Sequence, residues 1–272
     1  AMAALHVFLA GAFMYLCLRY LEPGRPLRVP AAFAGAIAYM FSDMFIVHFG
    51  NLNLIGVAAW LPLVILLFWR ALRSRSLGLT ITAGLVLGIS TLEGHLQITL
   101  MIGLALGLAT LVSAWSLHRE RPGLGEARYW AWPLLQLGIT AAVAAGLSAL
   151  VLLPAVEYAR LSPRAMLPYR EAARYSLIPG LLGELWVPGL FSSREPLLHW
   201  GVWDRVATGY LGVFPLLLAG LAVLLRRGQR LRLLLVAGIA GFLLALGGAS
   251  VFHGWAYLLL PGFDQLRAPA RF

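Results

Sequence analysis

The chain has 272 residues, of which 61% are hydrophobic and 12% are charged, and a soluble domain usually has about twice that charged fraction. A water-soluble fold could not cover this much apolar surface, so the composition excludes a soluble domain and predicts a protein folded in lipid. The net charge of +10 comes from arginines in short clusters between apolar runs, and this distribution argues against a nucleic-acid-binding stripe.

Eight apolar runs approach the roughly 20 residues that a spanning helix needs. The polar turn Glu93-Gly94-His95 separates the fourth run from the fifth. The sequence therefore predicts an all-α polytopic bundle with about eight spanning helices, in a single transmembrane domain over residues 1–272. In chain order, the runs are Ala4 to Leu21, Ala31 to Phe49, Leu54 to Leu72, Leu77 to Leu92, Leu96 to Leu117, Trp130 to Leu153, Tyr210 to Leu225 and Leu233 to Leu246.

Arginines mark every second connection between these runs, and the second and fourth connections contain none. Basic loops remain in the cytoplasm. The odd connections are therefore predicted to be cytoplasmic, and the even connections and the C-terminal segment are predicted to lie outside. The marking residues are Arg19, Arg25 and Arg28, then Arg70, Arg73 and Arg75, then Arg119, Arg121 and Arg128, and finally Arg226, Arg227, Arg230 and Arg232.

The sixth connection, residues 154–209, is much longer than the others and is predicted to be an outer loop. It contains both arginines and glutamates, but long translocated loops are largely exempt from the charge rule. Its middle, Leu177 to Phe191, is apolar but interrupted by proline and glycine. This segment is predicted to lie at the membrane interface. A long loop in a compact protein is usually functional.

The lone Cys17 excludes a disulfide within the chain and any site built from several cysteines. The chain opens in helix-like sequence without a signal peptide, and it stops shortly after a polar turn. We expect it to be a fragment of a longer protein.

Ionisable groups at membrane depth are costly, so they are the first candidates for function. Here they gather on the predicted outer side. Arginine binds phosphate with two parallel hydrogen bonds and keeps its charge when desolvated, and a carboxylate can act as a general base. The pattern suits a phosphate-bearing ligand. The residues are Asp43 and His48 near the end of the second run, Glu93, His95 and Gln97 in the fourth connection, Glu157, Arg160 and Arg164 after the sixth run, and Arg267 and Arg271 beyond the eighth.

Each of these groups also has a purely structural interpretation. Asp43 could pair with an arginine or cap a kink, and Glu93-Gly94-His95 could be a polar turn at the lipid–water boundary. Glu157 and Arg160 could form an ion pair at a helix end. Arg267 and Arg271 could extend to lipid headgroups.

No metal site is predicted, because Glu93 and His95 have no further ligand at a recognised spacing. A divalent cation at the outer carboxylates is left open, and the sequence indicates no other cofactor.

Several short stretches, taken together and in order, resemble one family. They include Leu5-His6-Val7-Phe8-Leu9-Ala10-Gly11, Ala38-Tyr39-Met40-Phe41-Ser42, Ala59-Trp60-Leu61-Pro62-Leu63, Glu93-Gly94-His95-Leu96-Gln97, Leu153-Pro154 with Glu157 and Ser162-Pro163-Arg164, Tyr175-Ser176-Leu177-Ile178-Pro179, Gly209-Tyr210-Leu211-Gly212, and Leu260-Pro261-Gly262-Phe263 leading to Arg267-Ala268-Pro269-Ala270-Arg271-Phe272. The set resembles the YfhO-like family of bacterial membrane proteins, which belongs to the GT-C type of membrane glycosyltransferase.

The resemblance implies transfer of a sugar from a polyprenyl-phosphate carrier to a cell-envelope acceptor, at the outer face of the bacterial cytoplasmic membrane and with inversion at the sugar carbon. GT-C proteins usually place a catalytic carboxylate in the first outer loop. This sequence is expected to begin at the family's second helix, so it lacks that loop and its catalytic base is unknown. Glu93 and Asp43 are the remaining candidates for the base. His95 and Gln97 would line the site, and Glu157, Arg160, Arg164, Arg267 and Arg271 would hold phosphate or sugar.

Two other functions fit the composition. A transporter or flippase for a lipid-linked or anionic substrate would need polar residues that continue to the inner side. A non-catalytic membrane scaffold would need no outer carboxylates, yet Glu93, Glu157 and Glu184 are present.

Overall fold

In a computed structural model, the described residues are 1–22, 24, 26–120, 126–162, 167–187, 210, 212–225, 229–260 and 262–271. They form helices and turns, and no strand occurs among them. The predicted all-α class is therefore confirmed. The chain divides into two compact units. Unit 1 comprises Ala1–Phe41 and His48–Ala155, and unit 2 comprises Ser42–Val47 and Val156–Phe272.

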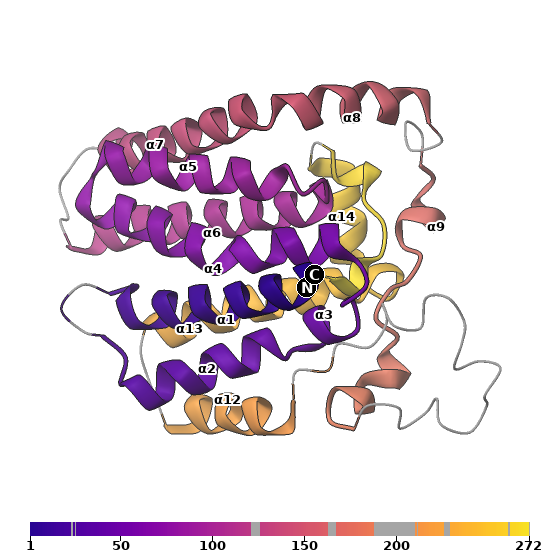
Figure 1. The fold of residues 1–272 in the computed structure, drawn as a ribbon, viewed down its shortest axis with the longest axis horizontal. Coiled ribbons are helices and arrows are strands. Elements are labelled where there is room, and N and C mark those ends of the chain that lie inside the picture. Colours follow the sequence, from indigo (N-terminus) through magenta and orange to yellow (C-terminus); the bar gives the residue numbers. More distant parts are fainter. Residues whose placement is uncertain are drawn as a thin grey trace. The chain divides into compact units, whose positions relative to one another are not determined.

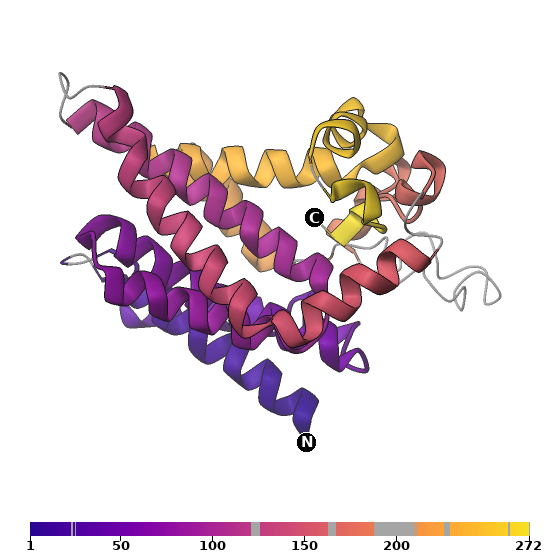
Figure 2. The same cartoon turned by 90° about the horizontal axis from the view of Figure 1, so that it is seen from above.

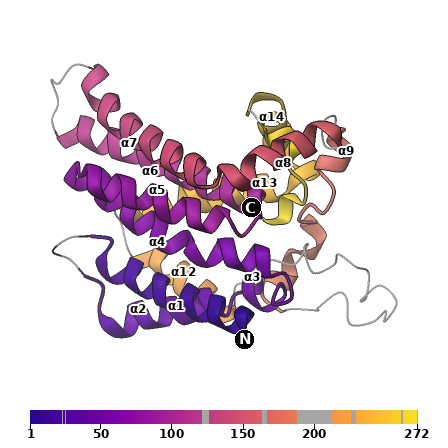
Figure 3. The same ribbon diagram turned by 45° about the horizontal axis from the view of Figure 1, so that its top comes forward.

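Unit 1 is a helical bundle whose long helices run alongside one another (Figure 1, Figure 3). α4 packs against α1, α5, α6 and α7, and α2 packs against α1. The helices are α1 (Met2–Tyr20), α2 (Val29–Met40), α4 (Leu52–Ser74), α5 (Leu77–Thr91), α6 (Leu96–Glu120) and α7 (Glu126–Leu147).

Unit 2 contains shorter elements. Its apolar helices are α12 (Val213–Leu225) and α13 (Gln229–Ala245). The sequence prediction missed the nine-residue helix α14 (Val251–Leu259), whose apolar run is too short to suggest a span. The remaining elements are α3 (Asp43–Ile46), α9 (Tyr169–Ala172), and the 3₁₀ helices η2 (Pro179–Leu185), η3 (Gly247–Ala249), η4 (Phe263–Gln265) and η5 (Pro269–Arg271).

Four helices are long and apolar enough to cross a membrane: Met2–Tyr20, Leu52–Ser74, Leu96–Arg119 and Tyr129–Leu147. The other four predicted runs correspond to shorter apolar helices, Val29–Met40, Leu77–Thr91, Val213–Leu225 and Leu234–Ala245. Large apolar side chains such as Phe8 and Leu150 lie exposed on the helices. A chain with these features is a helical membrane protein.

The predicted second helix, Ala31 to Phe49, is wrong in one respect, because it breaks after Met40. Ser42 is extended and precedes the four-residue α3, which belongs to unit 2. Ser and Asp favour helix starts over helix interiors because their side chains compete for backbone hydrogen bonds. Asp43 therefore begins a separate helix and does not lie on the second one, and its N–H donates to the Tyr210 carbonyl at 3.3 Å.

The predicted sixth helix, Trp130 to Leu153, is two helices. α7 ends at Leu147, and α8 (Ala149–Leu161) continues after a bend (Figure 2). At the bend the Ser148 hydroxyl donates to the Ala144 carbonyl at 2.7 Å, a contact that often bends helices. The first part of the predicted outer loop 154–209 is thus helical, and α9 and η2 follow. Residues 163–166 and 188–209 of that loop lie outside the described residues.

α5 and α7 approach each other closely along a line of small residues. A Cβ on Gly84 would lie 2.9 Å from the Thr140 carbonyl oxygen, and one on Gly88 would lie 2.9 Å from Leu147 Cβ. Small residues four apart are how helices in lipid come into van der Waals contact. Close packing at these glycines therefore sets the distance between the two helices.

Hydrogen bonds of buried side chains also join α7 to its neighbours. The Gln136 amide of α7 donates to the Ala71 carbonyl at 2.8 Å and to the Thr80 hydroxyl at 3.0 Å. The Thr140 hydroxyl donates to the Thr80 carbonyl at 3.3 Å. Gln136, Thr80 and Thr140 are fully buried. These bonds join α4, α5 and α7 where no water could replace them.

Pro62 interrupts the backbone hydrogen bonds of α4, because proline has no N–H to donate to the carbonyl of Ala58, four residues earlier. The Tyr39 hydroxyl of α2 donates to that carbonyl at 2.8 Å. A backbone carbonyl left without a donor in apolar surroundings is costly. Tyr39 therefore supplies the hydrogen bond that Pro62 removes, and it links α2 to α4.

We predict that Tyr39→Phe destabilises the protein by about 1–3 kcal/mol, the cost of an unsatisfied buried acceptor. In the Pro62→Ala background the restored backbone N–H can bond the Ala58 carbonyl, so the same substitution should cost close to nothing. Thermal unfolding of the four proteins in detergent completes the double-mutant cycle. An equal cost in both backgrounds would mean that the Tyr39 hydroxyl does not replace the missing bond.

Candidate functional site

Glu93 contacts His6 within unit 1. Its Oε1 lies 3.4 Å from Nε2 of His6 on α1, and the His6 Nδ1 lies 2.9 Å from the Met2 carbonyl oxygen. His6 is buried, whereas the Glu93 side chain is 35% exposed. The turn that carries Glu93 is permitted by Gly94, whose φ is +88°. The carboxyl thus sits at the edge of the bundle with an imidazole behind it.

The hydrogen bonds of His6 constrain where its protons lie. A carbonyl oxygen only accepts, so the Nδ1 that faces Met2 must carry hydrogen. A hydrogen bond between Nε2 and Glu93 Oε1 then requires a proton on one of these two atoms. The carboxyl and the imidazole are therefore joined by a hydrogen bond between α1 and the turn that follows α5.

Gly56 of α4 makes room for this carboxyl. A Cβ at position 56 would lie 2.9 Å from both Cδ and Oε2 of Glu93. Three elements therefore meet here, namely α1, α4 and the turn between α5 and α6. Glu93 is a candidate from the sequence, whereas His6 and Gly56 are not, because nothing in their local sequence indicates that they meet Glu93.

His95 and Gln97, which the sequence placed beside Glu93, lie at the start of α6. The Ile98 N–H lies 3.4 Å from His95 Nδ1 and donates to it, so His95 caps the helix. Gln97 lies in the first turn of α6. No hydrogen bond joins either side chain to Glu93 among the described residues.

Unit 2 contains a second concentration of charge, which we call the arginine cluster: Glu171, Arg174, Tyr175 and Arg267. Oε2 of Glu171 lies 3.5 Å from Nη1 of Arg174 and 3.8 Å from Nη2 of Arg267. The two guanidinium carbons lie 5.2 and 5.9 Å from the centre of the Tyr175 ring. The cluster thus combines one carboxylate with two guanidinium groups at a partly exposed site.

The backbone holds the two halves of the arginine cluster together. The Ala268 N–H donates to the Arg174 carbonyl, and the Ala270 N–H donates to the Tyr175 carbonyl, both at 3.2 Å. Arg267 was a sequence candidate, whereas Glu171, Arg174 and Tyr175 were not. The i,i+3 spacing of Glu171 and Arg174 is a local signal that the sequence contains. The contact of Glu171 with Arg267 joins distant segments, and no local pattern indicates it.

The other sequence candidates are not brought into this cluster by any contact among the described residues. Glu157 and Arg160 are exposed on α8, and no ion pair joins them. Arg164 lies outside the described residues, as does the side chain of Arg271.

Asp43 is half-buried at the start of α3, and burial raises the pKa of its carboxyl from 3.8 to about 7. Desolvation disfavours the charged form. A carboxyl that titrates near neutral pH suits proton transfer, so Asp43 stays a candidate base within unit 2.

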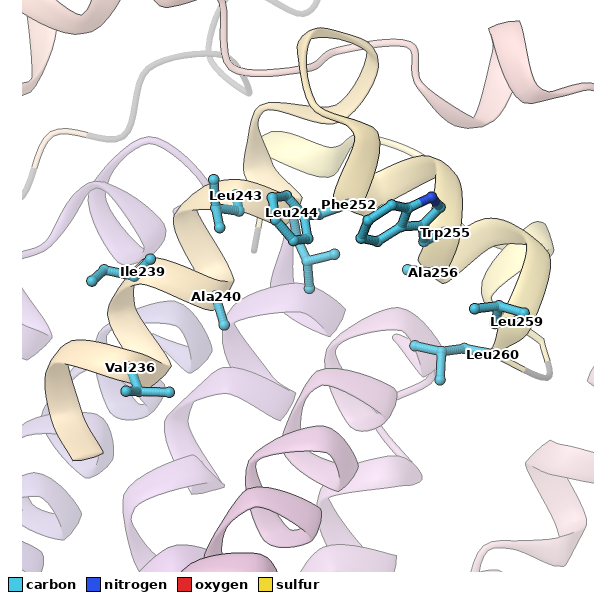
Figure 4. Close-up of a pocket in the computed structure, with 10 residues that line it drawn as sticks. All are labelled: Val236, Ile239, Ala240, Leu243, Leu244, Phe252, Trp255, Ala256, Leu259 and Leu260. Carbon is cyan, nitrogen blue, oxygen red and sulfur yellow. The ribbon is translucent and has the colours of Figure 1, made fainter. Parts of the chain in front are cut away.

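An open apolar cavity of about 490 Å³ lies along α13 and α14. Figure 4 shows side chains from both helices around it. No lining residue is polar or charged, apart from the indole N–H of Trp255. This α13–α14 cavity is lined by Val236, Ile239, Ala240, Leu243, Leu244, Phe252, Trp255, Ala256, Leu259 and Leu260.

Hydrogen bonds and ring contacts connect the cavity helices to the arginine cluster. The Leu177 N–H, two residues after Tyr175, donates to the Ala245 carbonyl at the end of α13 at 2.8 Å. Tyr169 of α9 packs on α14, with its ring 5.7 Å from His253 and 5.3 Å from Tyr257. The cluster and the cavity therefore belong to one packed part of unit 2.

His253 supports this packing as a neutral side chain. It is 2% exposed and lies between the rings of Tyr169 and Phe263. Burial lowers the pKa of His253 below its ordinary 6.5, so the imidazole is uncharged at neutral pH. Its contacts explain the orientation of α14 against α9 and η4.

Metal ligands do not gather in the described part of the chain: nowhere in it do three His, Cys, Asp or Glu side chains lie together. The arginine cluster is instead suited to an anion, because guanidinium groups bind phosphate or carboxylate oxygens. The neighbouring cavity is suited to a hydrocarbon chain.

Comparison with protein families, with characterised proteins and with solved structures gives no match for this chain.

We predict that stability falls as pH rises through the titration of Asp43. Its folded-state pKa of about 7 lies above the ordinary 3.8, so the stabilisation is complete below about pH 4 and is lost as pH rises through about 7. Asp43→Asn should therefore unfold at a higher temperature than the parent protein at about pH 8, and the difference should narrow toward about pH 6.5.

The measurement is thermal unfolding in detergent above roughly pH 6.5, where His253 stays neutral in both proteins. Glu157→Gln is the matched control, since it removes an exposed carboxylate. Parallel pH curves for the parent and Asp43→Asn proteins would contradict the prediction.

Proposed function

We propose that this chain is a membrane glycosyltransferase of the GT-C type that transfers a sugar from a polyprenyl-phosphate carrier to an acceptor. The observation that supports this most strongly is the arginine cluster next to the apolar α13–α14 cavity. A lipid phosphate has the same two parts, an anionic head and a hydrocarbon tail. The sequence resemblance to the YfhO-like family supports the same substrate class.

The arginine cluster has the features of a phosphate site. Arg174 and Arg267 both point to Glu171 Oε2, so their guanidinium groups face a shared region. Two guanidinium groups can each donate two hydrogen bonds to phosphate oxygens. Glu171 keeps the groups close together in the absence of ligand.

In the proposed reaction, an acceptor hydroxyl oxygen bonds to the sugar carbon while the bond from that carbon to the carrier phosphate oxygen breaks. The arginines stabilise the charge that develops on the departing lipid phosphate. The hydroxyl proton passes to a carboxylate. Asp43, which belongs to the same unit as the arginines, is the candidate for that base from the structure, and Glu93 stays a candidate from the sequence.

The proposal includes eight spans, the four long helices together with the four shorter apolar ones. With the arginine-rich odd connections in the cytoplasm, Glu93 and the arginine cluster face the outside of the bacterial cytoplasmic membrane. Carrier and acceptor would then meet at the outer surface.

We predict that Arg174→Gln and Arg267→Gln each weaken binding of polyprenyl monophosphate by about tenfold or more, since a hydrogen bond to a charged group contributes ~1.5–3 kcal/mol. Ala240→Trp, which fills the cavity, should weaken binding of both polyprenyl phosphate and uncharged polyprenol. Arg70→Gln is the matched control for the arginine variants, and Leu234→Trp is the matched control for Ala240→Trp. Both residues are exposed and lie outside the arginine cluster and the α13–α14 cavity. Binding is measured on the full-length protein in nanodiscs.

Transfer is tested with the same variants and a polyprenyl-phosphate donor carrying a labelled sugar. The arginine variants, Glu93→Ala, His95→Ala and Arg164→Ala should reduce the label that reaches the envelope acceptor. Unchanged transfer in all of them would make the site assignment wrong. Carrier movement across the bilayer without sugar transfer would favour a flippase.

We predict that the two ends of α4 lie on opposite sides of the membrane. In a Cys17→Ser background, Gly50→Cys precedes α4 and Ser74→Cys lies in its last turn, and both positions are exposed. A membrane-impermeant maleimide added to intact spheroplasts should label Gly50→Cys. Ser74→Cys should react only after permeabilisation. The reverse pattern would invert the orientation and place the arginine cluster on the wrong side for an external acceptor.

A further inference from the structure

Three residues with left-handed backbone meet beside the arginine cluster. They are Tyr175, Gly247 and Ala268, with φ of 63°, 49° and 57°. A Cβ on Gly247 would collide with the Ser176 side chain and lie 2.8 Å from Pro269 Cγ. Three segments that are distant in the sequence are thus packed tightly at one point of unit 2.

Two of these residues are unusual in this conformation. Glycine adopts it freely, but for other residues Cβ approaches the following carbonyl oxygen, at a cost of roughly 1–2 kcal/mol each. Arg75, the other non-glycine residue with positive φ in the described part of the chain, follows the end of α4. That is a common place for a left-handed residue. Tyr175 and Ala268 differ from Arg75, because each lies beyond the C-cap residue of the short helix before it, and both C-cap residues, Ala173 and Leu266, have negative φ.

Each of the two strained residues directly follows an arginine of the cluster. Tyr175 follows Arg174, and Ala268 follows Arg267. The Ala268 N–H donates to the Arg174 carbonyl, so the two left-handed turns are tied together. Strain of this kind persists where the surrounding contacts fix it, and it concentrates at functional sites.

We propose that the left-handed backbone at Tyr175 and Ala268 positions Arg174 and Arg267 to bind one phosphate between them. The inference rests on the proposed function, because it takes the arginine cluster as the phosphate site. Both residues act through the arginines and are positioning residues. Their fixed backbone holds the guanidinium groups near each other before the ligand arrives, which lowers the entropy lost on binding.

The Ala268→Gly variant distinguishes an effect on phosphate affinity from an effect on folding stability. Glycine adopts the left-handed conformation without strain, so the unfolding temperature should stay the same or rise despite the loss of one buried methyl group. The segment also becomes more flexible, so the affinity for inorganic phosphate should fall about three- to tenfold. A merely structural role would change stability and binding in the same direction.

Arg75→Gly is the matched control. It relieves the same backbone conformation at the end of α4 in unit 1, so it should raise the unfolding temperature and leave phosphate affinity unchanged. Arg174→Gln and Arg267→Gln locate the binding site. Phosphate affinity is measured by ³¹P NMR on the full-length protein well below the unfolding temperature of each variant, so that changes in stability do not enter the affinity.

The outcomes separate this inference from the proposed function. If the parent protein does not bind phosphate, or if the two arginine variants bind it equally well, the arginine cluster is not the phosphate site and the proposed function loses its main support. If the arginine variants lose binding but Ala268→Gly retains the full affinity, the positioning inference alone is overturned. Loss of affinity in Ala268→Gly without a lower unfolding temperature supports it.

Discussion

The structure of unit 1 depends on the need to satisfy every backbone polar group without water. In lipid, an unpaired carbonyl has no water to accept a hydrogen bond from, so the chain forms helices throughout the bundle. α4 shows the constraint most clearly, because it packs against α1, α5, α6 and α7 and contains a proline. Where Pro62 leaves the Ala58 carbonyl without its helical donor, Tyr39 of α2 supplies one. Near the other end of α4, Gln136 of α7 donates to the Ala71 carbonyl. Polar side chains in this bundle are therefore placed where the backbone accepts them, and they fix the partners of α4 at both ends.

Apolar packing then decides how closely the helices approach. Gly84 and Gly88 let α7 come near enough for Gln136 and Thr140 to reach Thr80 and Ala71. A larger residue at either glycine would separate α5 from α7 and break hydrogen bonds that have no water to replace them. Gly56 acts in the same way for a different purpose, since its missing side chain makes room for the Glu93 carboxyl. Unit 1 thus combines a tightly packed interior with one carboxyl that is held at its edge by His6.

Sequence patterns predicted most of the helices, because apolar runs between arginine clusters are a local signal. All eight predicted runs contain helix, and several boundaries agree within a few residues. The errors arose where a single polar residue changed the local structure. The predicted second helix ends before Ser42, so Asp43 belongs to α3 in unit 2. The predicted sixth helix is divided at Ser148. The candidate sites were less predictable. Glu93 and Arg267 were recognised from their chemistry, but His6, Gly56, Glu171 and Arg174 were not, because their roles come from contacts between distant segments.

The arginines show why composition alone could not locate a site. Most of the positive charge lies in connections where it sets the orientation of the helices. Such arginines also touch aromatic rings, as Arg19 does with Tyr20 and Arg119 with Trp115. Each of these contacts pairs one guanidinium with one ring on its own helix end, which suits an anchor at the lipid–water boundary. Arg174 and Arg267 differ because they come from distant segments and share one ring and one carboxylate. Glu171 brings the two guanidinium groups to one place, which is the arrangement that the proposed phosphate site requires.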